Sequence, residues 1–468
     1  MSAVYRKYGL GFAVAVAVIG IAAAVLWLPV AAQTSGWTTP QLVFEGRGTL
    51  NTPTLVADDY GQVHAFWLFQ ADQLGNADTP PLQLYYTRLD RPAWPPTDIL
   101  IGQTIQLPVK AAMMRDGLAL LWGGNIFTWS GISPGPTARA WASPVTLQPV
   151  YPEAGLAVAP DGALWTIGGA GGTNEIYVQR LNPDTRVWEA PRLVSDPVNV
   201  NVAPDGTRLA ISADGTLHAV WAEYQLPNGW PPIGLYYARS SDGGQTWSSP
   251  RKIAGSNFNQ PNVLAGPDQQ VYVVWTGTAG TGMKYFQESL DGGHTWADPV
   301  MVMKQLGGGS EGAPNLAVDS AGNPHMVFSH NGCVWHVSRE NNVWSDPECI
   351  SSGTTANSDV ETPAMALGLG NTLHVLYWTD HRQLWYTSRV LDVPSRAPLP
   401  TPTAVIATAT VLAPTVTPVP TGTPLPNYGP FAQPGQATQP GVWAMVAGVA
   451  PVVLLFFVVA LFRKQSRQ

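Results

Sequence analysis

The sequence predicts an all-β fold, a β-propeller of seven four-stranded blades. Three observations lead to this prediction. A tryptophan followed three residues later by a proline recurs along the chain, short apolar runs bounded by Gly, Asp and Pro accompany it, and the repeats are about fifty residues apart. A repeat of this length indicates one four-stranded blade per unit.

The Trp-x-x-Pro units define the blades. Six carry the complete pattern: Trp37, Trp141, Trp188, Trp247, Trp296 and Trp344. A seventh unit at Trp94 is imperfect, because prolines follow at once and Thr97 takes the third position. Counted together, the seven tryptophans are 47 to 59 residues apart, which gives seven blades.

Each unit also contains a proline-led apolar run, as at Pro53, Pro261 and Pro363. We expect each of these prolines at the first residue of an inner strand, where no ladder donor is lost. The Trp-x-x-Pro element then begins the outermost strand. Because the chain starts with one such element and its last repeat lacks one, we expect Trp37 to Phe44 to close the final blade and remove the exposed edges.

The two ends of the chain look different from the propeller, which covers residues 37–392. Residues 1–32 combine Arg6 and Lys7 with an apolar run and small residues before Gln33, as in a secretory signal peptide; an uncleaved N-terminal anchor is the alternative. Residues 393–440 are rich in Pro and Thr and are expected to form an extended stalk.

An apolar segment without charges follows the stalk at residues 441–462 and is long enough for a transmembrane helix. Basic residues dominate the tail at 463–468, which the positive-inside rule places in the cytoplasm. The sequence therefore predicts a single-pass protein of the cell membrane with an extracellular propeller. The chain contains no Asn-x-Ser/Thr glycosylation sequon, which favours a bacterial source.

Composition excludes several classes of function. The net charge is −7, only 12% of residues are charged, and no basic patch occurs, so nucleic acid is not an expected partner. No zinc-ligand spacing, phosphate-binding glycine loop or nucleophile elbow is present. We expect neither a metal site nor a cofactor.

Two hairpins carry the pattern S-x-D-x-G-x-T-W. The residues are Ser240, Asp242, Gly244, Thr246 and Trp247 in one, and Ser289, Asp291, Gly293, Thr295 and Trp296 in the other. This is the Asp-box, and the chain resembles the sialidase-like (BNR-repeat) propellers. The expected role of the motif is structural: Asp accepts hydrogen bonds from turn amides, Gly permits positive φ, and Trp packs between blades.

The chain has two cysteines, Cys333 and Cys349, placed symmetrically about an expected turn at Asn341. In a hairpin they would lie opposite each other, within reach of a disulfide after local adjustment. Outside the membrane such a bond would persist. Two buried thiols or one reactive cysteine are the alternatives.

Strand alternation predicts that one face of the propeller, opposite the Asp-boxes, collects the loops that could bind a ligand. The expected ligand-binding residues are Arg47, Asn51, Glu223, Trp230, Asn259, His330 and Arg382. Glycoside hydrolysis requires two carboxyl groups about 5–10 Å apart. The acidic candidates for it are Glu311, Asp359, Glu361 and Asp380. The alternative for each residue is an ordinary solvated loop position.

The resemblance to sialidases implies arginines that hold a substrate carboxylate, one of them two residues before a proline. The matching positions here are Asn51, Asn259, Gly312 and Glu361, and none is Arg. We therefore expect a non-catalytic propeller that binds a glycan, peptide or protein partner through the loop face. The alternatives are a membrane-tethered glycoside hydrolase of the sialidase-like exo-glycosidase type and a structural subunit of an envelope assembly.

Overall fold

A computed structural model describes most of the predicted propeller. The described residues are 36–58, 61–73, 80–91, 97–98, 109–114, 117–123, 128–133, 142, 144–149, 154–169, 174–195, 201–227, 229–277, 283–302, 311–352 and 360–394. All of them belong to one compact unit. The signal segment, the transmembrane segment at 441–462, the basic tail and the stalk beyond Pro394 lie outside the described residues, as do Trp94 and Trp141. No helix in the described ranges is long and apolar enough to cross a bilayer.

Strands build the described part, and within it they form seven antiparallel sheets. The sheets are numbered here as blades along the chain, each from its inner to its outer strand. Blade 1 contains β2 (Gly48–Ala57), β3 (Val63–Ala71), β4 (Gln83–Arg88) and β5 (Thr97–Asp98). Blade 2 contains β6 (Val109–Met114), β7 (Gly117–Gly123), β8 (Thr128–Ser133) and β9 (Val145–Leu147). Blade 3 contains β10 (Ala154–Val158), β11 (Leu164–Gly169), β12 (Ile176–Leu181) and β13 (Arg192–Ser195).

The remaining four blades follow the same order. Blade 4 contains β14 (Val202–Ile211), β15 (Leu217–Gln225), β16 (Gly234–Ser240) and β17 (Arg251–Ala254). Blade 5 contains β18 (Phe258–Ala265), β19 (Val271–Gly277), β20 (Lys284–Ser289) and β21 (Val300–Met301). Blade 6 contains β22 (Glu311–Val318), β23 (Pro324–His330) and β24 (Cys333–Glu340), and its outer strand is split into β25 (Val343–Trp344) and β26 (Glu348–Cys349). Blade 7 contains β27 (Val360–Gly368), β28 (Thr372–Thr379) and β29 (Gln383–Val390), with β1 (Gln41–Glu45) at its edge.

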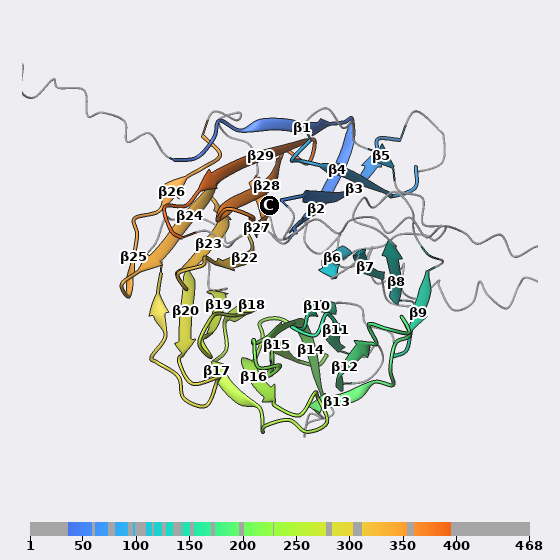
Figure 1. Ribbon diagram of the computed structural model, residues 1–468, viewed down its shortest axis with the longest axis vertical. Helices are drawn as coiled ribbons and strands as arrows, with labels where there is room; N and C mark the ends of the chain where they lie inside the picture. The colour runs from blue at the N-terminus through green and yellow to red at the C-terminus, as the bar shows by residue number, and fades with distance from the viewer. Residues whose placement is uncertain are drawn as a thin grey trace, which may run out of the picture. The chain divides into compact units, whose positions relative to one another are not determined.

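The seven inner strands form a closed ring. Each of β2, β6, β10, β14, β18, β22 and β27 contacts the next in this order, and β27 contacts β2. Figure 1 shows the blades arranged around this ring, with the short outer strands at the periphery. The predicted all-β propeller of four-stranded sheets is confirmed in the described residues.

The N-terminal strand closes the last blade, as the sequence predicts. Strand β1 pairs antiparallel with β29, and Trp37 forms a bridge with Arg389. The amide of Thr38 donates to the carbonyl of Ser388 at 2.8 Å. Both chain segments are thus needed to complete blade 7, which leaves no open edge between the first and last repeats.

The prolines of the inner strands do not begin these strands, which corrects the expectation from the sequence. Pro53, Pro261 and Pro363 lie inside β2, β18 and β27. Each lies within a β-bulge, as Pro53 does between Asn51 and Thr54. Proline is tolerated here because bulges and the free edges of inner strands both lack a ladder hydrogen bond.

The core consists of apolar layers between neighbouring blades, and the repeated tryptophans fill them from the outside. Each packs against the preceding blade: Trp296 on Tyr237 with ring centroids 4.8 Å apart, and Trp344 on Phe286 at 5.0 Å. Trp37 contacts His336 in the same way at 5.1 Å. The repetition of these tryptophans along the chain therefore reflects one packing position per blade.

Buried histidines near the start of the second strands hydrogen-bond to the third strands. The Nδ1 atom of His218 lies 2.8 Å from the hydroxyl of Tyr237, and that of His374 lies 2.7 Å from the hydroxyl of Tyr386. His64 and Tyr86 form the same pair at 3.0 Å. Burial lowers the pKa of His218 and of His374 to about 4, so these rings are neutral at pH 7.

Candidate functional site

The two faces of the propeller carry different connections. On the Asp-box face, inner strands turn into second strands and third strands turn into outer strands. The loop face carries the turns between second and third strands and the connections that enter each inner strand. Pro394, the last described residue, accepts hydrogen bonds from Asn371 and Ser320, which belong to turns of the Asp-box face.

In the Asp-box of blade 4, the carboxylate of Asp242 is fully occupied by its own turn. Its Oδ2 accepts from the hydroxyl of Thr246 at 2.6 Å, and its Oδ1 accepts from the amide of Thr246 at 2.9 Å and from the hydroxyl of Ser240 at 2.8 Å. The Ser240 hydroxyl accepts in turn from the amide of Gly244, whose φ is 76°. The hydrogen bonds, with that from Thr246 the largest, hold the pKa of Asp242 well below its usual range.

The Asp-box of blade 5 repeats this geometry. Asp291 accepts from the hydroxyl of Thr295 at 2.6 Å and from its amide at 2.8 Å, and its pKa is again lowered mainly by the Thr295 hydroxyl. Ser289 donates to Asp291 at 2.8 Å. Because both oxygens of each carboxylate accept hydrogen bonds from the turn, both boxes serve the fold.

A set of polar residues lies at the loop-face ends of the inner strands. In five blades the inner strand carries a bulge, and the residue just before it is an acid or an amide. These residues are Asn51, Asp205, Asn259, Glu311 and Glu361. The Oδ1 atoms of Asp205 and Asn259 accept from the next amide in the bulge at 2.7 and 2.6 Å. The side chains of Glu311 and Glu361 are outside the described set, and so is all of Asp359.

Asp205 is not recognisable from the sequence alone as a member of this set. Prolines mark the bulges in blades 1, 5 and 7, whereas blade 4 has Thr207 at the corresponding position. The register of β14 and β15 reveals the equivalence, because it shifts between Asp205 and Arg208 as it does after Asn51.

Glu223 lies on the second strand of blade 4, where it pairs with Pro204, next to Asp205. Its Oε1 accepts a hydrogen bond from Nε1 of Trp221 at 3.1 Å, and the hydroxyl of Tyr236 also bonds to this carboxyl. Burial raises the pKa of Glu223 in spite of these hydrogen bonds and of nearby Lys252. Burial, together with the charge of Glu223, also raises the pKa of Tyr236.

Trp230 lies in the connection that follows the Glu223 strand. Its side chain is 60% exposed, and its ring centroid is 6.3 Å from that of Tyr224. On the far side of the hairpin, Nζ of Lys252 donates to the carbonyl of Ile233 at 2.9 Å. Tyr224, the ring beside Trp230, packs toward blade 5, whereas Glu223 bonds to Trp221 on the side of the sheet that packs toward blade 3.

A second cluster lies at the seam between blades 7 and 1. The amide of Gly46 donates to the carbonyl of Arg382 at 3.1 Å, and the amide of Asp72 donates to the carbonyl of Arg47 at 2.9 Å. Both arginines are exposed, and neither has a side-chain partner among the described residues. Asp380 is exposed in the same hairpin turn, with φ 52°.

His330 differs from the expectation that it is an exposed loop residue. It is only 3% exposed, and neither ring nitrogen has a hydrogen-bond partner among the residues that the structure describes. It ends β23 immediately before a two-residue Asn-Gly turn. Strand alternation directs it, with Phe328, toward blade 5, where Nζ of the buried Lys284 lies 5.7 Å from the Phe328 ring. The side chain therefore belongs to the interior between blades 5 and 6.

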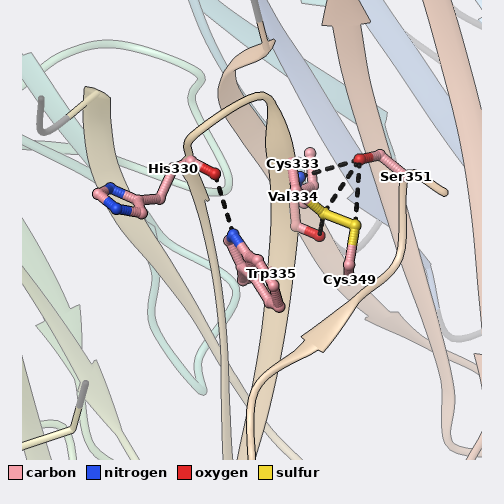
Figure 2. The surroundings of a disulfide bond; sticks show 6 residues. All are labelled: His330, Cys333, Val334, Trp335, Cys349 and Ser351. Carbon is pink, nitrogen blue, oxygen red and sulfur yellow. Dashed lines mark hydrogen bonds between the residues drawn. A yellow bond between two sulfur atoms is a disulfide. The ribbon is translucent and has the colours of Figure 1, made fainter. Parts of the chain in front are cut away.

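Cys333 and Cys349 form a disulfide with a Cα–Cα distance of 5.9 Å. Figure 2 shows it with Ser351, whose hydroxyl donates to Sγ of Cys333 and accepts from the amide of Val334. The two cysteines are not direct cross-strand partners, since Cys349 pairs with Trp335. The expected register was wrong because the turn is the pair Asn341–Asn342 and because the outer strand is interrupted between β25 and β26.

The described residues contain no group of His, Cys, Asp or Glu side chains that could hold a metal ion. Of the four predicted acids, Asp380 is the one whose side chain is described, and it lies in a turn of blade 7. Blade 4 instead provides the acids Glu223 and Asp205 on adjacent strands.

No protein-family model and no curated relative matches the sequence. Solved structures with the same fold include an ulvan lyase, a polysaccharide lyase, with a TM-score of 0.52 at 9% identity, covering 77% of this chain and 100% of that one. The polysaccharide lyase Uly1 gives 0.52 at 9% identity, with 75% and 91% covered. The sialidase NanB of Streptococcus pneumoniae gives 0.44 at 14% identity, with 76% and 71% covered. The chain thus shares its propeller fold with carbohydrate-active proteins, and the similarity to the sialidase is too low to support membership of that family.

Proposed function

We propose that this protein binds a carbohydrate through the loop face of its propeller. The observation that carries the proposal is the set of acids and amides that precede the inner-strand bulges of five blades on this face, from Asn51 to Glu361. Carboxyl and amide groups are suited to the many hydroxyls of a sugar. The fold shared with polysaccharide lyases supports the same class of ligand.

The arginine pattern of sialidases is missing from these positions, which argues for binding without sialidase chemistry. Arg47 follows β1 and Arg382 lies in the turn between β28 and β29, so neither belongs to the set at the bulges. We therefore propose a display module, anchored in the cell membrane by residues 441–462 and extended on the Pro/Thr-rich stalk. The last described residue, Pro394, lies on the Asp-box face.

A glycan array probed with the full-length protein in mild detergent tests the proposal. We expect binding to at least one glycan class, weakened by substitutions at the loop face such as Asn259→Ala. The control is Val187→Ala, at an exposed hairpin position of the Asp-box face. Absence of binding to all glycans, or equal losses in both variants, would reject carbohydrate binding by the loop face.

A second candidate function is glycan cleavage, favoured by the raised pKa of Glu223 beside Asp205. Glycoside hydrolysis uses two carboxyl groups, of which the general acid has a raised pKa. Turnover of the bound glycan that is abolished in both Glu223→Gln and Asp205→Asn would establish it. Binding without turnover would leave the display function.

A further inference from the structure

We propose that the closure of the ring is acid-sensitive: proton uptake by the buried pair His325–His336 loosens the closing segment, residues 36–45, which completes blade 7. The inference concerns regulation of the fold and does not depend on the proposed carbohydrate binding. It starts from a difference between blade 6 and other blades, at the point where Trp37 packs on His336.

Blade 6 has a histidine where three other blades have a tyrosine. In those blades a buried histidine of the second strand hydrogen-bonds to a tyrosine of the third strand. The pairs are His64–Tyr86, His218–Tyr237 and His374–Tyr386. In blade 6 the second-strand histidine is His325, and the strand register places His336 at the position of the tyrosines. A phenol gains no charge in mild acid, whereas an imidazole becomes a cation.

The two imidazoles of blade 6 are in direct contact. Nδ1 of His325 lies 3.2 Å from Nε2 of His336, and the stacked rings have centroids 5.4 Å apart. Nε2 of His325 lies 3.4 Å from Oδ2 of Asp319, so in the neutral pair Nε2 of His325 donates to Asp319 and Nδ1 accepts from His336. If both rings were cations, two N–H groups would face each other across this contact. The fully protonated pair would therefore lose its hydrogen bond and bring two like charges together.

Charged groups face the pair from the turn after β22, from β24 and the outer edge of blade 6, and from β29. They are Asp319, Glu340, Asp346, Glu348 and Arg389. Glu348 and Arg389 bond to each other at 3.2 Å. Burial, and after it the charges of His325 and Arg389, hold the pKa of His336 well below its usual range. Any opening that brings this ring into water removes the cost of burial, so a fall in pH favours the open form.

Trp37 covers His336 with an edge-on contact. The ring centroids are 5.1 Å apart, and Nε1 of Trp37 has no hydrogen-bond partner within the described ranges, so packing holds the indole in place. His336 is only 3% exposed, yet it forms part of the wall of a groove that Gly36 and Trp344 also line. A shift of Trp37 would therefore open His336 to the water of this groove. Because Trp37 belongs to the closing segment and bridges to Arg389, proton uptake by His336 is linked to release of this segment.

The test is hydrogen exchange of the full-length protein in mild detergent, measured on peptides that cover the closing segment at pH 7.5 and at pH 5.5. After correction for the intrinsic exchange rate, opening of this segment should increase about tenfold at the lower pH, because an imidazole with an unfolded-state pKa of about 6.5 gains a proton on opening. His336→Tyr, which restores the pair of the other blades, should keep the change within about twofold. His336→Gln, a second uncharged replacement, should do the same.

His218→Gln is the matched control, because it removes the second-strand histidine of blade 4 and leaves the pair in blade 6 intact. It should keep the increase of about tenfold. Opening that does not rise in the wild type, or that rises equally in the wild type and in the two His336 variants, would overturn the proposal. A response that His218→Gln also abolishes would assign it to unfolding of the whole propeller and would overturn the proposal as well.

Discussion

The phenolic oxygen of Tyr237 in blade 4 lies directly under Gly293 in the Asp-box of blade 5: a Cβ atom placed on Gly293 would be 1.8 Å from it. The same hydroxyl bonds to His218, and the ring packs edge-on against Trp296. One tyrosine therefore connects the buried histidine of one blade with the Asp-box of the next.

Substitution of Gly293 by alanine is expected to destabilise the propeller by about 2–5 kcal/mol. The backbone at Gly293 has φ 84°, which costs an L-residue about 1–2 kcal/mol, and displacing Tyr237 adds an overpacking cost of about 1–3 kcal/mol. Gly215→Ala is the control, because φ is 87° there but no atom lies within 4 Å of the added Cβ. Urea unfolding of both variants should separate the two costs; equal losses would show that Tyr237 moves aside freely.

Acid should destabilise the fold in a window set by the buried histidines. The folded-state pKa of His218 and of His374 is about 4, below the ordinary value of 6.5, so the unfolded chain binds protons more tightly. The stability these neutral rings provide is complete above pH 6.5 and is lost as the pH falls toward about 4. Each histidine contributes up to about 3 kcal/mol to this loss, because a difference of one between the folded and unfolded pKa corresponds to about 1.4 kcal/mol.

Melting temperatures measured from pH 7.5 to pH 4.5 check this expectation. His218→Gln should lower stability at pH 7.5, because the hydrogen bond to Tyr237 changes, and should make the decline between pH 6.5 and pH 4.5 shallower. A decline equally steep in the variant would assign the acid sensitivity to other groups. Asp242 and Asp291 titrate below their usual range, so their contribution is lost at lower pH than this window.

The periodic features of the fold could be predicted because local residues determine them. Trp37, Trp247 and Trp296 each mark one packing position per blade, and the Asp-box is closed by hydrogen bonds within a single turn. A buried-histidine signal was also present and was missed. A histidine follows a turn glycine by three residues at His64 and His218.

The candidate site depended on register, which the sequence does not display. Asp205 joins the set at the inner-strand bulges only once the shift in β14 is known, since its blade lacks the marker proline. His330 reads as an ordinary loop residue, yet the packing of blade 6 on blade 5 buries it. Cys349 bonds to Cys333 through the disulfide, yet in the strand ladder it lies opposite Trp335 because the outer strand is interrupted.

The disulfide should contribute about 3 kcal/mol to stability. It joins residues 16 apart. Closing a loop of about that size lowers the conformational entropy of the unfolded chain, which stabilises the fold by roughly this amount. The double variant Cys333→Ser/Cys349→Ser should unfold at correspondingly lower urea concentration, and reductant should shift the wild type but not the variant. Hydrogen exchange should be fastest near β26, which pairs with β24 through two residues only. An unchanged midpoint would show that Ser351 and the strand pairing suffice to hold this edge.

Arg339 and Glu288 join blades 6 and 5, and breaking this pair should be costly. The two side chains are only 12% and 14% exposed, and both guanidinium nitrogens reach the carboxylate, one of them at 2.8 Å. Arg339→Met leaves Glu288 without its partner and is expected to cost about 3 kcal/mol, as in other buried pairs. The double variant Arg339→Met/Glu288→Gln removes the isolated charge and should recover a large part of the loss. Urea unfolding of the single and double variants measures the coupling. A loss below about 1 kcal/mol in Arg339→Met would show that water screens the pair as at an open surface, and that apolar packing alone holds these two blades together.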